Sequence, residues 1–451
     1  MHFVQGLLTA RAHIAFLVGL GLSLGVVWQI ERHAPRAATT GIVDFRALVE
    51  LPQLAQPKLA AVGVPLSDAE LTMARTAWRY FENNTQAATG FVNSVDKYPS
   101  TTLWDLGSYA MALLAAADLG IIDNTTATAR ETALLKSLAA VPLVEGRLPN
   151  KAYDTRTLHM VDYANRESPR GIGWSSIDIA RLGVPLTILA WRHPEQTAAV
   201  KAVLAHLHLN DAVRAGALEG ADRRADGSLR LVQEGRFGYE QYAAKSLFLF
   251  GLDVSRAIRY DVGVRVVDVS DQAIAYDARL PKDYGNTHNA VLSEPYLLEA
   301  LEFGLTEVTS PLTASVYSAQ RNHFAETHHL TAVSEDNIDR APWFVYNSVL
   351  NGMKAWAAFA PDGTDASTHK TLSTKAAVGW AYLYDDDYAH ALRAAVVELQ
   401  DPARGFYSGR YDNDGAINRA ITSNTNAVVL EALWYKKRGP LVAASRQTVT
   451  P

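Results

Sequence analysis

The sequence lacks cysteine altogether: none occurs among its 451 residues. Disulfide bonds, thiolate nucleophiles and cysteine-ligated metal sites are therefore excluded. A strong charge of either sign is also missing, because 42 Lys and Arg stand against 47 Asp and Glu, which leaves a net charge of −5. Proteins that bind nucleic acid usually carry a basic patch, so we expect no nucleic-acid partner.

The common nucleotide, hydrolase and metal motifs are absent as well. The chain contains no P-loop, no G-x-G-x-x-G, no G-x-S-x-G and no H-E-x-x-H. Nucleotide chemistry, an α/β-hydrolase and a zinc-protease site are therefore disfavoured. We predict a protein that needs neither a metal nor an organic cofactor.

The N-terminus contains the longest apolar run of the chain. Ala12 to Ile30 includes one histidine and no formally charged group. A helix that spans a bilayer needs about 20 apolar residues, and no convincing small-residue cleavage site follows the run. We therefore expect an uncleaved, single-pass anchor in the inner membrane, with the globular part in the periplasm. A cleaved signal peptide is the alternative.

Five segments follow from this pattern. They are an N-terminal segment (1–11), the anchor (12–30), a linker (31–65), a globular domain (66–440) and a C-terminal tail (441–451). Prolines interrupt the linker and deny it a long helix. The globular part begins at Ser67, which makes a capping box with Glu70 ahead of a helical pattern.

Two kinds of helix alternate along the globular part. Almost entirely apolar segments begin near residues 103, 174, 239, 294, 346, 374 and 425, and several are separated by amphipathic segments such as "TARETALLKSLAAV". Apolar helices form an inner ring and amphipathic helices face water outside it. The sequence predicts an all-α (α/α) toroid of six or seven helical hairpins, with a short strand or hairpin at 265–271.

In such a ring the inner helices start at one mouth, where helix N-termini add partial positive charge. Hydrolysis of a glycosidic bond needs two carboxyl groups, one as acid and one as base or nucleophile. The catalytic candidates at or near these starts are Glu240, Glu294, Asp105, Glu335 and Asp336. Glu240, with a tyrosine on either side, is the leading one.

Each candidate also has a purely structural interpretation. Asp105 and Glu294 could cap their helices, and Asp178 is expected to pair with Arg181. The loop acids around Glu335 could simply be solvated. Aromatic and polar residues at the same starts and loops would bind the sugar; they are Trp104, Asp154, Asp162, Arg170, Trp174, Tyr239, Tyr242, Arg340, Trp343, Tyr346, Asn347, Lys375, Asn424 and Asn426.

Eight ordered blocks resemble a known bacterial family. Among them are "YPSTTLWDLGSYAMAL", "GIGWSSIDIARL", "TAVSEDNIDRAPWFVYN" and "NTNAVVLEALWY". The family is catalogued as domain of unknown function number 3131, and the resemblance covers about residues 66 to 440. This family is in turn similar, more loosely, to six-hairpin glycosidases, which include glucoamylases and endo-β-1,2-glucanases. The resemblance implies the toroid and a sugar cleft, and it carries over no catalytic pair.

The sequence thus favours a membrane-tethered periplasmic glycoside hydrolase or transglycosylase that acts on a bacterial polysaccharide, a glucan above all. Two alternatives remain. One is a non-catalytic glycan-binding or polysaccharide-export accessory protein. The other is a polysaccharide lyase, in which a Tyr or His base would act beside cations that neutralise a uronate; its candidates are Tyr153, Tyr163, His159, Arg156 and Arg166.

Overall fold

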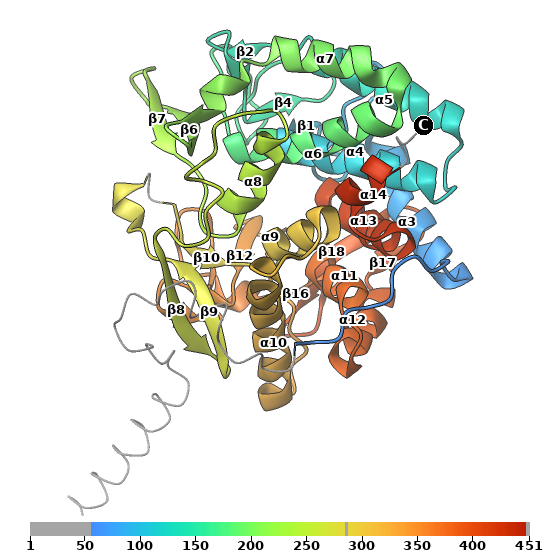
Figure 1. The fold of residues 1–451 in the computed structure, drawn as a ribbon, viewed down its shortest axis with the longest axis vertical. Coiled ribbons are helices and arrows are strands. Elements are labelled where there is room, and N and C mark those ends of the chain that lie inside the picture. Colours follow the sequence, from blue (N-terminus) through green and yellow to red (C-terminus); the bar gives the residue numbers. More distant parts are fainter. Residues whose placement is uncertain (1–55, 285–286, 448–451) are drawn as a thin grey trace, which may run out of the picture.

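Inner helices form a closed ring in the computed structural model, which describes residues 56–284 and 287–447. In this part of the chain six inner helices pack each against the next, and the last packs against the first (Figure 1). They are α4 (Leu103–Asp118), α6 (Ser176–Arg192), α8 (Tyr239–Phe248), α9 (Ser293–Leu298), α11 (Thr374–Leu383) and α13 (Ser423–Arg438). The turn η4 (Glu299–Phe303) continues α9 as a π-helix. The ring confirms the predicted (α/α) toroid.

The second kind of helix lies outside the ring. These helices are α3 (Asp68–Asn84), α5 (Asn124–Leu138), α7 (Thr197–His206), α10 (Thr309–Thr327) and α12 (Asp387–Val397). They bury one face only, whereas every residue of α11 is buried. This difference in burial is the predicted one, because an inner helix has neighbours on all sides. The short α14 (Leu441–Gln447) packs against α6, α13 and η4.

Short antiparallel sheets connect the helices. Their strands are β1 (Ser100–Thr102) with β4 (Ala152–Asp154); β2 (Leu143–Val144) with β3 (Leu148–Pro149); β5 (Val213–Arg214), β6 (Ala217–Arg223) and β7 (Leu229–Gln233); β8 (Val264–Val269) with β9 (Gln272–Asp277); β10 (Ala290–Val291), β13 (Leu350–Asn351) and β14 (Lys354–Ala355); β11 (Glu335–Asn337), β12 (Phe344–Asn347) and β15 (Ala358–Phe359); and β16 (Thr371–Ser373), β17 (Gln400–Asp401), β18 (Gly405–Tyr411) and β19 (Ile417–Ile421). Single 3-10 turns are η1 (Pro194–Gln196), η2 (Leu209–Ala212), η3 (Pro281–Asp283) and η5 (Ser367–His369).

One predicted inner helix is wrong. The segment that starts near residue 346 forms β12 to β15 instead of a helix. Its residues pair with β11 in a fixed register, in which Glu335 faces Tyr346 and Asp336 faces Val345. Alternate burial along β12 accompanies this pairing, since Val345 and Asn347 are buried while Tyr346 is partly exposed. The predicted strand at 265–271 is confirmed by the β8–β9 hairpin.

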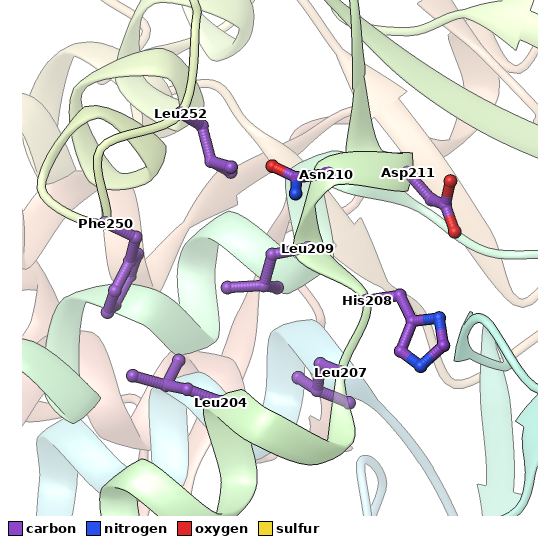
Figure 2. Close-up of a pocket in the computed structure, with 8 residues that line it drawn as sticks. All are labelled: Leu204, Leu207, His208, Leu209, Asn210, Asp211, Phe250 and Leu252. Atoms are coloured by element: carbon purple, nitrogen blue, oxygen red, sulfur yellow. The ribbon is translucent and has the colours of Figure 1, made fainter.

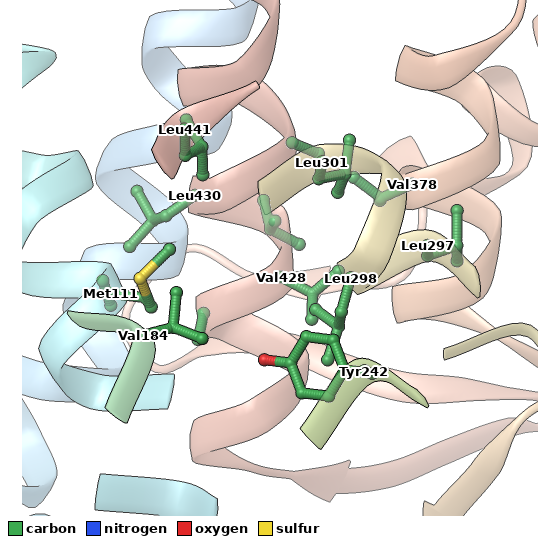
Figure 3. Close-up of a cluster of buried hydrophobic side chains, with 14 of the residues drawn as sticks. Met111, Val184, Tyr242, Leu297, Leu298, Leu301, Val378, Val428, Leu430 and Leu441 are labelled. Carbon is green, nitrogen blue, oxygen red and sulfur yellow. The ribbon is translucent and has the colours of Figure 1, made fainter. Parts of the chain in front are cut away.

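The interior of the ring is a packed core. Figure 3 shows side chains from all six inner helices meeting there, among them Met111, Val184, Tyr242, Val378 and Val428. Leu441 of α14 joins the same cluster. The six helices are therefore held together by contact between their apolar sides, and their polar starts are left to form loops at one end.

No helix within residues 56–284 and 287–447 is long and apolar enough to cross a membrane. The predicted anchor at residues 12–30 lies outside the described residues, and it stays a prediction.

Candidate functional site

Hydroxyl caps begin four of the inner helices and fix the orientation of the residues that follow. The capping residues are Thr102, Ser175, Ser373 and Thr422. Each accepts a hydrogen bond from a backbone N–H in the first turn, which satisfies a donor that the helix cannot use. As a result, the third residues of α4 and α6 occupy equivalent positions.

Those third residues are Asp105 and Asp178. The hydroxyl of Thr102 donates to Asp105 Oδ2 at 2.8 Å, and the hydroxyl of Ser175 donates to Asp178 Oδ1 at 3.0 Å. Ser94 also donates to Asp105 Oδ2, at 2.5 Å. Both aspartates are partly exposed on helices that are otherwise buried. They therefore point out of the ring core toward its mouth.

The second residues of α9, α11 and α13 form a polar triad. Lys375 Nζ donates to Glu294 Oε2, and Asn424 Nδ2 donates to Glu294 Oε1 at 2.6 Å. Lys375 Nζ also lies 3.9 Å from Asp336 Oδ1. Burial acts to lower the pKa of Lys375, but the surrounding carboxylates act more strongly in the other direction. The pKa therefore lies above its usual value. The ammonium group therefore stays charged and holds the triad together.

Glu335 and Asp336 on β11 bring two more carboxyl groups to this triad. Burial and the nearby Glu294 raise the pKa of Glu335 to about 7. Burial raises the pKa of Asp336 to about 7, although Lys375 acts against it. The hydroxyl of Tyr239 donates a hydrogen bond to Glu335 Oε1. The other oxygen, Glu335 Oε2, is shielded from water and has no hydrogen-bond partner among the described residues. Glu335 is partly exposed and Asp336 is buried.

A third group of acids continues from Asp178. Burial and the carboxylate of Glu234 raise the pKa of Asp178 to about 7. Glu234 follows β7 directly and accepts a hydrogen bond of 2.5 Å from the backbone N–H of Ser176. Burial raises the pKa of Tyr346, and the carboxylates of Glu335 and Asp178 raise it further. Tyr346 therefore lies within electrostatic reach of both carboxyl groups.

Tyr163 lies over the same region. The residue is 67 % exposed. The carboxylates of Asp178 and Glu234 and the phenol of Tyr346 act to raise its pKa, so groups on three other elements lie within electrostatic reach of its hydroxyl. We call the group at the ring mouth the mouth cluster; its members are Asp105, Asp178, Glu234, Glu294, Glu335, Asp336, Lys375, Asn424, Tyr239 and Tyr346.

Trp104 borders the mouth cluster. It is partly exposed, and its ring meets that of Tyr239 edge to face at 5.6 Å between centroids. Of the residues predicted from sequence, the structure thus brings together Asp105, Glu294, Glu335, Asp336, Trp104, Tyr239, Tyr346, Lys375 and Asn424.

Glu240 belongs to a different cluster. It is 5 % exposed, accepts a hydrogen bond of 2.5 Å from Arg279 Nη2, and accepts another from Gln233 at 2.9 Å. Burial raises its pKa, and the other groups that act on that pKa are Arg279, Asp277 and Arg236. At this helix start it is Tyr239 that faces the mouth, one residue before the leading candidate. Glu240 is therefore in a structural ion pair.

Several predicted sugar-binding residues are buried and bound by their own fold. Trp174 is fully buried and its indole N–H donates to the carbonyl of Glu219. Tyr242 is fully buried in the core, and Asn426 accepts a hydrogen bond from the backbone N–H of Phe406. No face of these side chains is left for a sugar, so the structure corrects all three assignments. Asn347 is also buried, on the opposite side of β12 from Tyr346.

Other predicted residues lie on loops outside the mouth cluster. Asp154 pairs with Arg156, and Asp162 pairs with Arg166, so both aspartates bind cations of their own loop. Arg170 donates to the carbonyl of Gly227. Two further predicted residues lie on the loop after β11. Arg340 lies over the ring of Tyr411, and Trp343 is 63 % exposed.

Two acids of the mouth cluster were not among the residues predicted for the site. Asp178 was interpreted as structural, but its expected pair with Arg181 is wrong, because Arg181 binds Glu302 and Glu431 in the core. Equivalence to Asp105, three residues after a hydroxyl cap, is the signal that identifies Asp178. Glu234 was not singled out, and its signal is weaker: it is an acid at the end of a strand, just before Gly235.

Two features bear on other kinds of site. A surface pocket of about 530 Å³ lies between the end of α7 and the segment after α8, where Leu204, Leu209, Phe250 and Leu252 surround it (Figure 2). It contains none of the mouth cluster. Within residues 56–284 and 287–447, no group of three or more His, Asp or Glu side chains is placed to hold a metal ion.

Comparison with solved structures shows the same fold in sugar-active proteins. A glucoamylase-like protein from Bacteroides caccae matches at 13 % identity with a TM-score of 0.60, over 84 % of this chain and 96 % of that one. An endo-β-1,2-glucanase from Chitinophaga pinensis, with bound sophorotriose and glucose, matches at 11 % and 0.57, over 84 % and 95 %. An endo-β-1,2-glucanase from Talaromyces funiculosus, with β-1,2-glucan, matches at 10 % and 0.55, over 84 % and 86 %.

No curated protein matches the sequence. A family model does match it over residues 72–439, which is most of the chain and all six inner helices. This match agrees with the eight sequence blocks described above. The chain belongs to the family described as Protein of unknown function (DUF3131).

Proposed function

We propose that the protein is a glycoside hydrolase or transglycosylase that cleaves a glucan at the mouth cluster. The observation that carries this proposal is the state of Glu335. Its carboxyl group has a pKa raised to about 7 and belongs to a partly exposed residue; its Oε2, which is shielded from water, has no hydrogen-bond partner among the described residues. Such a group can hold a proton at neutral pH and give it to a leaving oxygen.

Glu335 is the general acid in this proposal. Tyr239 donates to Oε1, so the proton resides on Oε2, the oxygen that has no protein partner. Glu294 acts against ionisation of Glu335, and it is itself held by Lys375 and Asn424. The buried Glu294 and Lys375 therefore help to set the pKa of the acid, and the partly exposed Asn424 orients Glu294.

Asp105 is the second carboxyl group. Burial raises its pKa above the usual value; the hydroxyl groups of Ser94 and Thr102, which both donate to its Oδ2, favour the charged form and partly offset this effect. Two carboxyl groups in different surroundings, one kept protonated and one supported by donors, are the pattern of acid and base in glycosidases. Asp178 and Glu234 would bind sugar hydroxyl groups beside them.

Charge at the mouth argues against the lyase alternative. A lyase needs cations to neutralise a uronate, but carboxyl groups dominate the mouth cluster. The arginines proposed for that role, Arg156 and Arg166, pair with acids of their own loop, and Tyr153 is buried with its hydroxyl on the carbonyl of Pro142. An uncharged polysaccharide is the better fit.

The glucan is chosen from the structural relatives. Proteins of this fold include endo-β-1,2-glucanases seen with sophorotriose or β-1,2-glucan. A β-linked glucan is therefore the first substrate to test. The membrane tether and the periplasmic location remain part of the proposal and depend on the apolar run at residues 12–30.

The test is a cleavage assay with the purified full-length protein. It is incubated with α- and β-glucans, β-1,2-glucan included, and products are followed by thin-layer chromatography. Glu335→Gln removes the proton donor, and we expect kcat to fall by about 10²- to 10⁴-fold. Glu82→Gln is the matched control, because Glu82 forms only an exposed pair with Arg79. Equal cleavage by wild type and Glu335→Gln would refute the acid assignment. Binding of glucan without cleavage by the wild type would favour the non-catalytic alternative.

A further inference from the structure

A second recess lies behind the mouth cluster, on the other side of β12. Its volume is about 220 Å³, and Asn347, Lys370 and Asp412 line it together with side chains from the end of α10. Consecutive residues of a strand point to opposite faces. Tyr346 faces the mouth cluster and Asn347 lines this cavity, so the two sites share β12 but do not overlap.

The cavity presents polar groups without protein partners. Asn347 is 1 % exposed; its Nδ2 donates to Thr371 at 3.2 Å, but its Oδ1 is buried and has no hydrogen-bond partner among the described residues. Lys370 Nζ likewise has neither a hydrogen bond nor an ion pair in residues 56–284 and 287–447, although Lys370 is partly buried. Asn347 Oδ1 is shielded within the wall, whereas Lys370 is partly exposed, so the ammonium group of Lys370 is the unused donor that the cavity offers to a polar ligand.

The lining also favours an uncharged ligand. Lys370 brings a positive charge and Asp412 a negative one, and Asp412 Oδ1 lies 3.1 Å from His329 Nε2. Burial lowers the pKa of His323 to about 4, with contributions from Lys370 and His329, so its imidazole is neutral at pH 7. An anion would meet Asp412, and a cation would meet Lys370. A sugar ring carries hydroxyl groups that both donate and accept, and it can satisfy both sides at once.

Size and an aromatic wall complete the argument. The ring of Trp356 stacks on that of His323 at 4.1 Å between centroids, which fixes the indole at the cavity wall. Pockets for drug-sized ligands have volumes of about 300–1,000 Å³. A cavity of about 220 Å³ is smaller than these and suits a single sugar ring better than an oligosaccharide.

We propose that this cavity is a second saccharide-binding site, which takes one uncharged pyranose unit between Lys370, Asn347 and Asp412. The choice of glucose as the unit rests on the proposed function at the mouth cluster. The chemistry of the cavity does not depend on cleavage.

The test uses NMR spectra of the ¹⁵N-labelled full-length protein and follows the indole N–H signal of Trp356. The signal is assigned by its absence from the spectrum of Trp356→Phe. Titration with glucose should move this signal saturably. Lys370→Met removes a charged donor worth about 1.5–3 kcal/mol, so we expect the affinity for glucose to fall by at least about 10-fold. Lys58→Met is the control, because Lys58 is exposed and pairs only with Asp385; it should bind glucose as the wild type does.

Three outcomes would overturn the proposal. They are no saturable shift of the Trp356 signal with glucose, an equal shift with inorganic phosphate, and unchanged affinity in Lys370→Met. If Lys370→Met does not fold, Asp412→Asn tests the same lining from its acceptor side. The cleavage assay separates the two proposals, since cleavage without a shift at Trp356 refutes only this site, and a shift without cleavage refutes only the proposed hydrolysis.

Discussion

Two clusters of buried charge occupy the same ring and differ in one respect. In the core, Arg181 contacts Glu302 and Glu431, and all three side chains have no exposed surface. At the mouth, Lys375 contacts Glu294 and lies near Asp336, with the partly exposed Glu335 beside them. Each cluster has one cation and more than one carboxyl group. Only the mouth cluster has carboxyl-bearing residues that are partly exposed, among them Glu335 and Asp105.

The difference shows why a raised pKa alone does not identify a catalytic group. Burial raises the pKa of Glu302 and of Glu431, as it does for Glu335. In the core, however, Tyr242 and Arg181 both donate to Glu302, and all three side chains are fully buried. An oxygen without a partner does not distinguish the clusters, because Glu335 Oε2 and Glu431 Oε2 are both buried and have none among the described residues. The residue Glu335 is partly exposed, whereas Glu302 and Glu431 are fully buried, and this difference separates the proposed chemistry from structure here.

The clusters are also connected. Arg181 Nε donates to Ser108 Oγ at 3.4 Å, and Ser108 Oγ donates to Asn424 Oδ1 at 3.1 Å. Asn424 in turn donates to Glu294. A structural charge in the core thus helps to orient a group that acts on the proposed acid.

The largest effect is expected from breaking the core cluster. Arg181→Met leaves two buried carboxyl groups without their cation, and removal of one partner of a buried pair costs about 3–5 kcal/mol. The free energy of unfolding, measured by denaturant titration, should fall by that amount. Arg79→Met, which removes an exposed pair with Glu82, should cost less than about 1 kcal/mol. A fall of similar size in both variants would contradict the role of Arg181.

A matched pair of isosteric variants sharpens the comparison. Glu335→Gln should lower kcat by about 10²- to 10⁴-fold without lowering the free energy of unfolding, because it removes a carboxyl group whose ionisation opposes folding. Glu302→Gln should do the reverse, because it disturbs a buried hydrogen-bonded charge and touches no substrate; we expect a loss of about 1–3 kcal/mol. Assay and unfolding measurements on both proteins would show whether the two effects separate. If Glu302→Gln lowers kcat as much as Glu335→Gln does, the distinction fails.

The pH dependence tests the proposed proton donor. Because Glu335 has a pKa of about 7, the protonated and active form is lost as pH rises through about 7, and kcat/KM should fall there. Stability changes in the same direction. The folded pKa exceeds the ordinary value of 4.5, so the folded protein binds more protons and the free energy of unfolding decreases as pH rises from about 4 to about 7. Glu335→Gln should reduce this slope. A rate that rises through pH 7 would exclude Glu335 as the acid.

The smallest effect is expected at the connection. Ser108→Ala removes a neutral hydrogen bond to Asn424, worth about 0.5–1.5 kcal/mol. We expect a decrease of less than about 10-fold in kcat and a shift of the pH–rate profile, since Glu294 loses part of its support. Asn424→Asp in the same assay should have a larger effect, because it puts a carboxylate against Glu294. If neither variant shifts the pH–rate profile, the proposed connection between the two clusters is contradicted.

Helix patterns carried most of the fold prediction. Apolar and amphipathic segments differ over ten or more residues, so α4 to α13 could be assigned to the inner or outer ring from sequence. The exception was residues 344–359, where an apolar composition with small residues fits a helix and a sheet about equally. Pairing with β11 decides between them, and such pairing joins residues that local patterns do not connect.

Site prediction depended on the orientation of single residues. Glu294, Lys375, Asn424 and Asp105 follow helix starts closely, and the structure brings them together. Glu240 is also near a helix start, but the glycine before α8 has a φ of 99°, and Arg279 from beyond β9 binds the glutamate. Nothing local distinguishes Glu240 from Tyr239, because the direction of a side chain at a helix start depends on what packs around it.

The ring could be predicted from the sequence alone, since the alternation of fully apolar and one-sided helices has few other packed solutions, and capping residues mark where the inner helices begin. Which carboxyl groups meet depends on the tertiary structure. Glu335, Asp105 and Lys375 lie on three elements far apart in the chain, and their pKa values arise from burial and mutual charge. Both quantities depend on distances between elements, which exist only once the ring has closed.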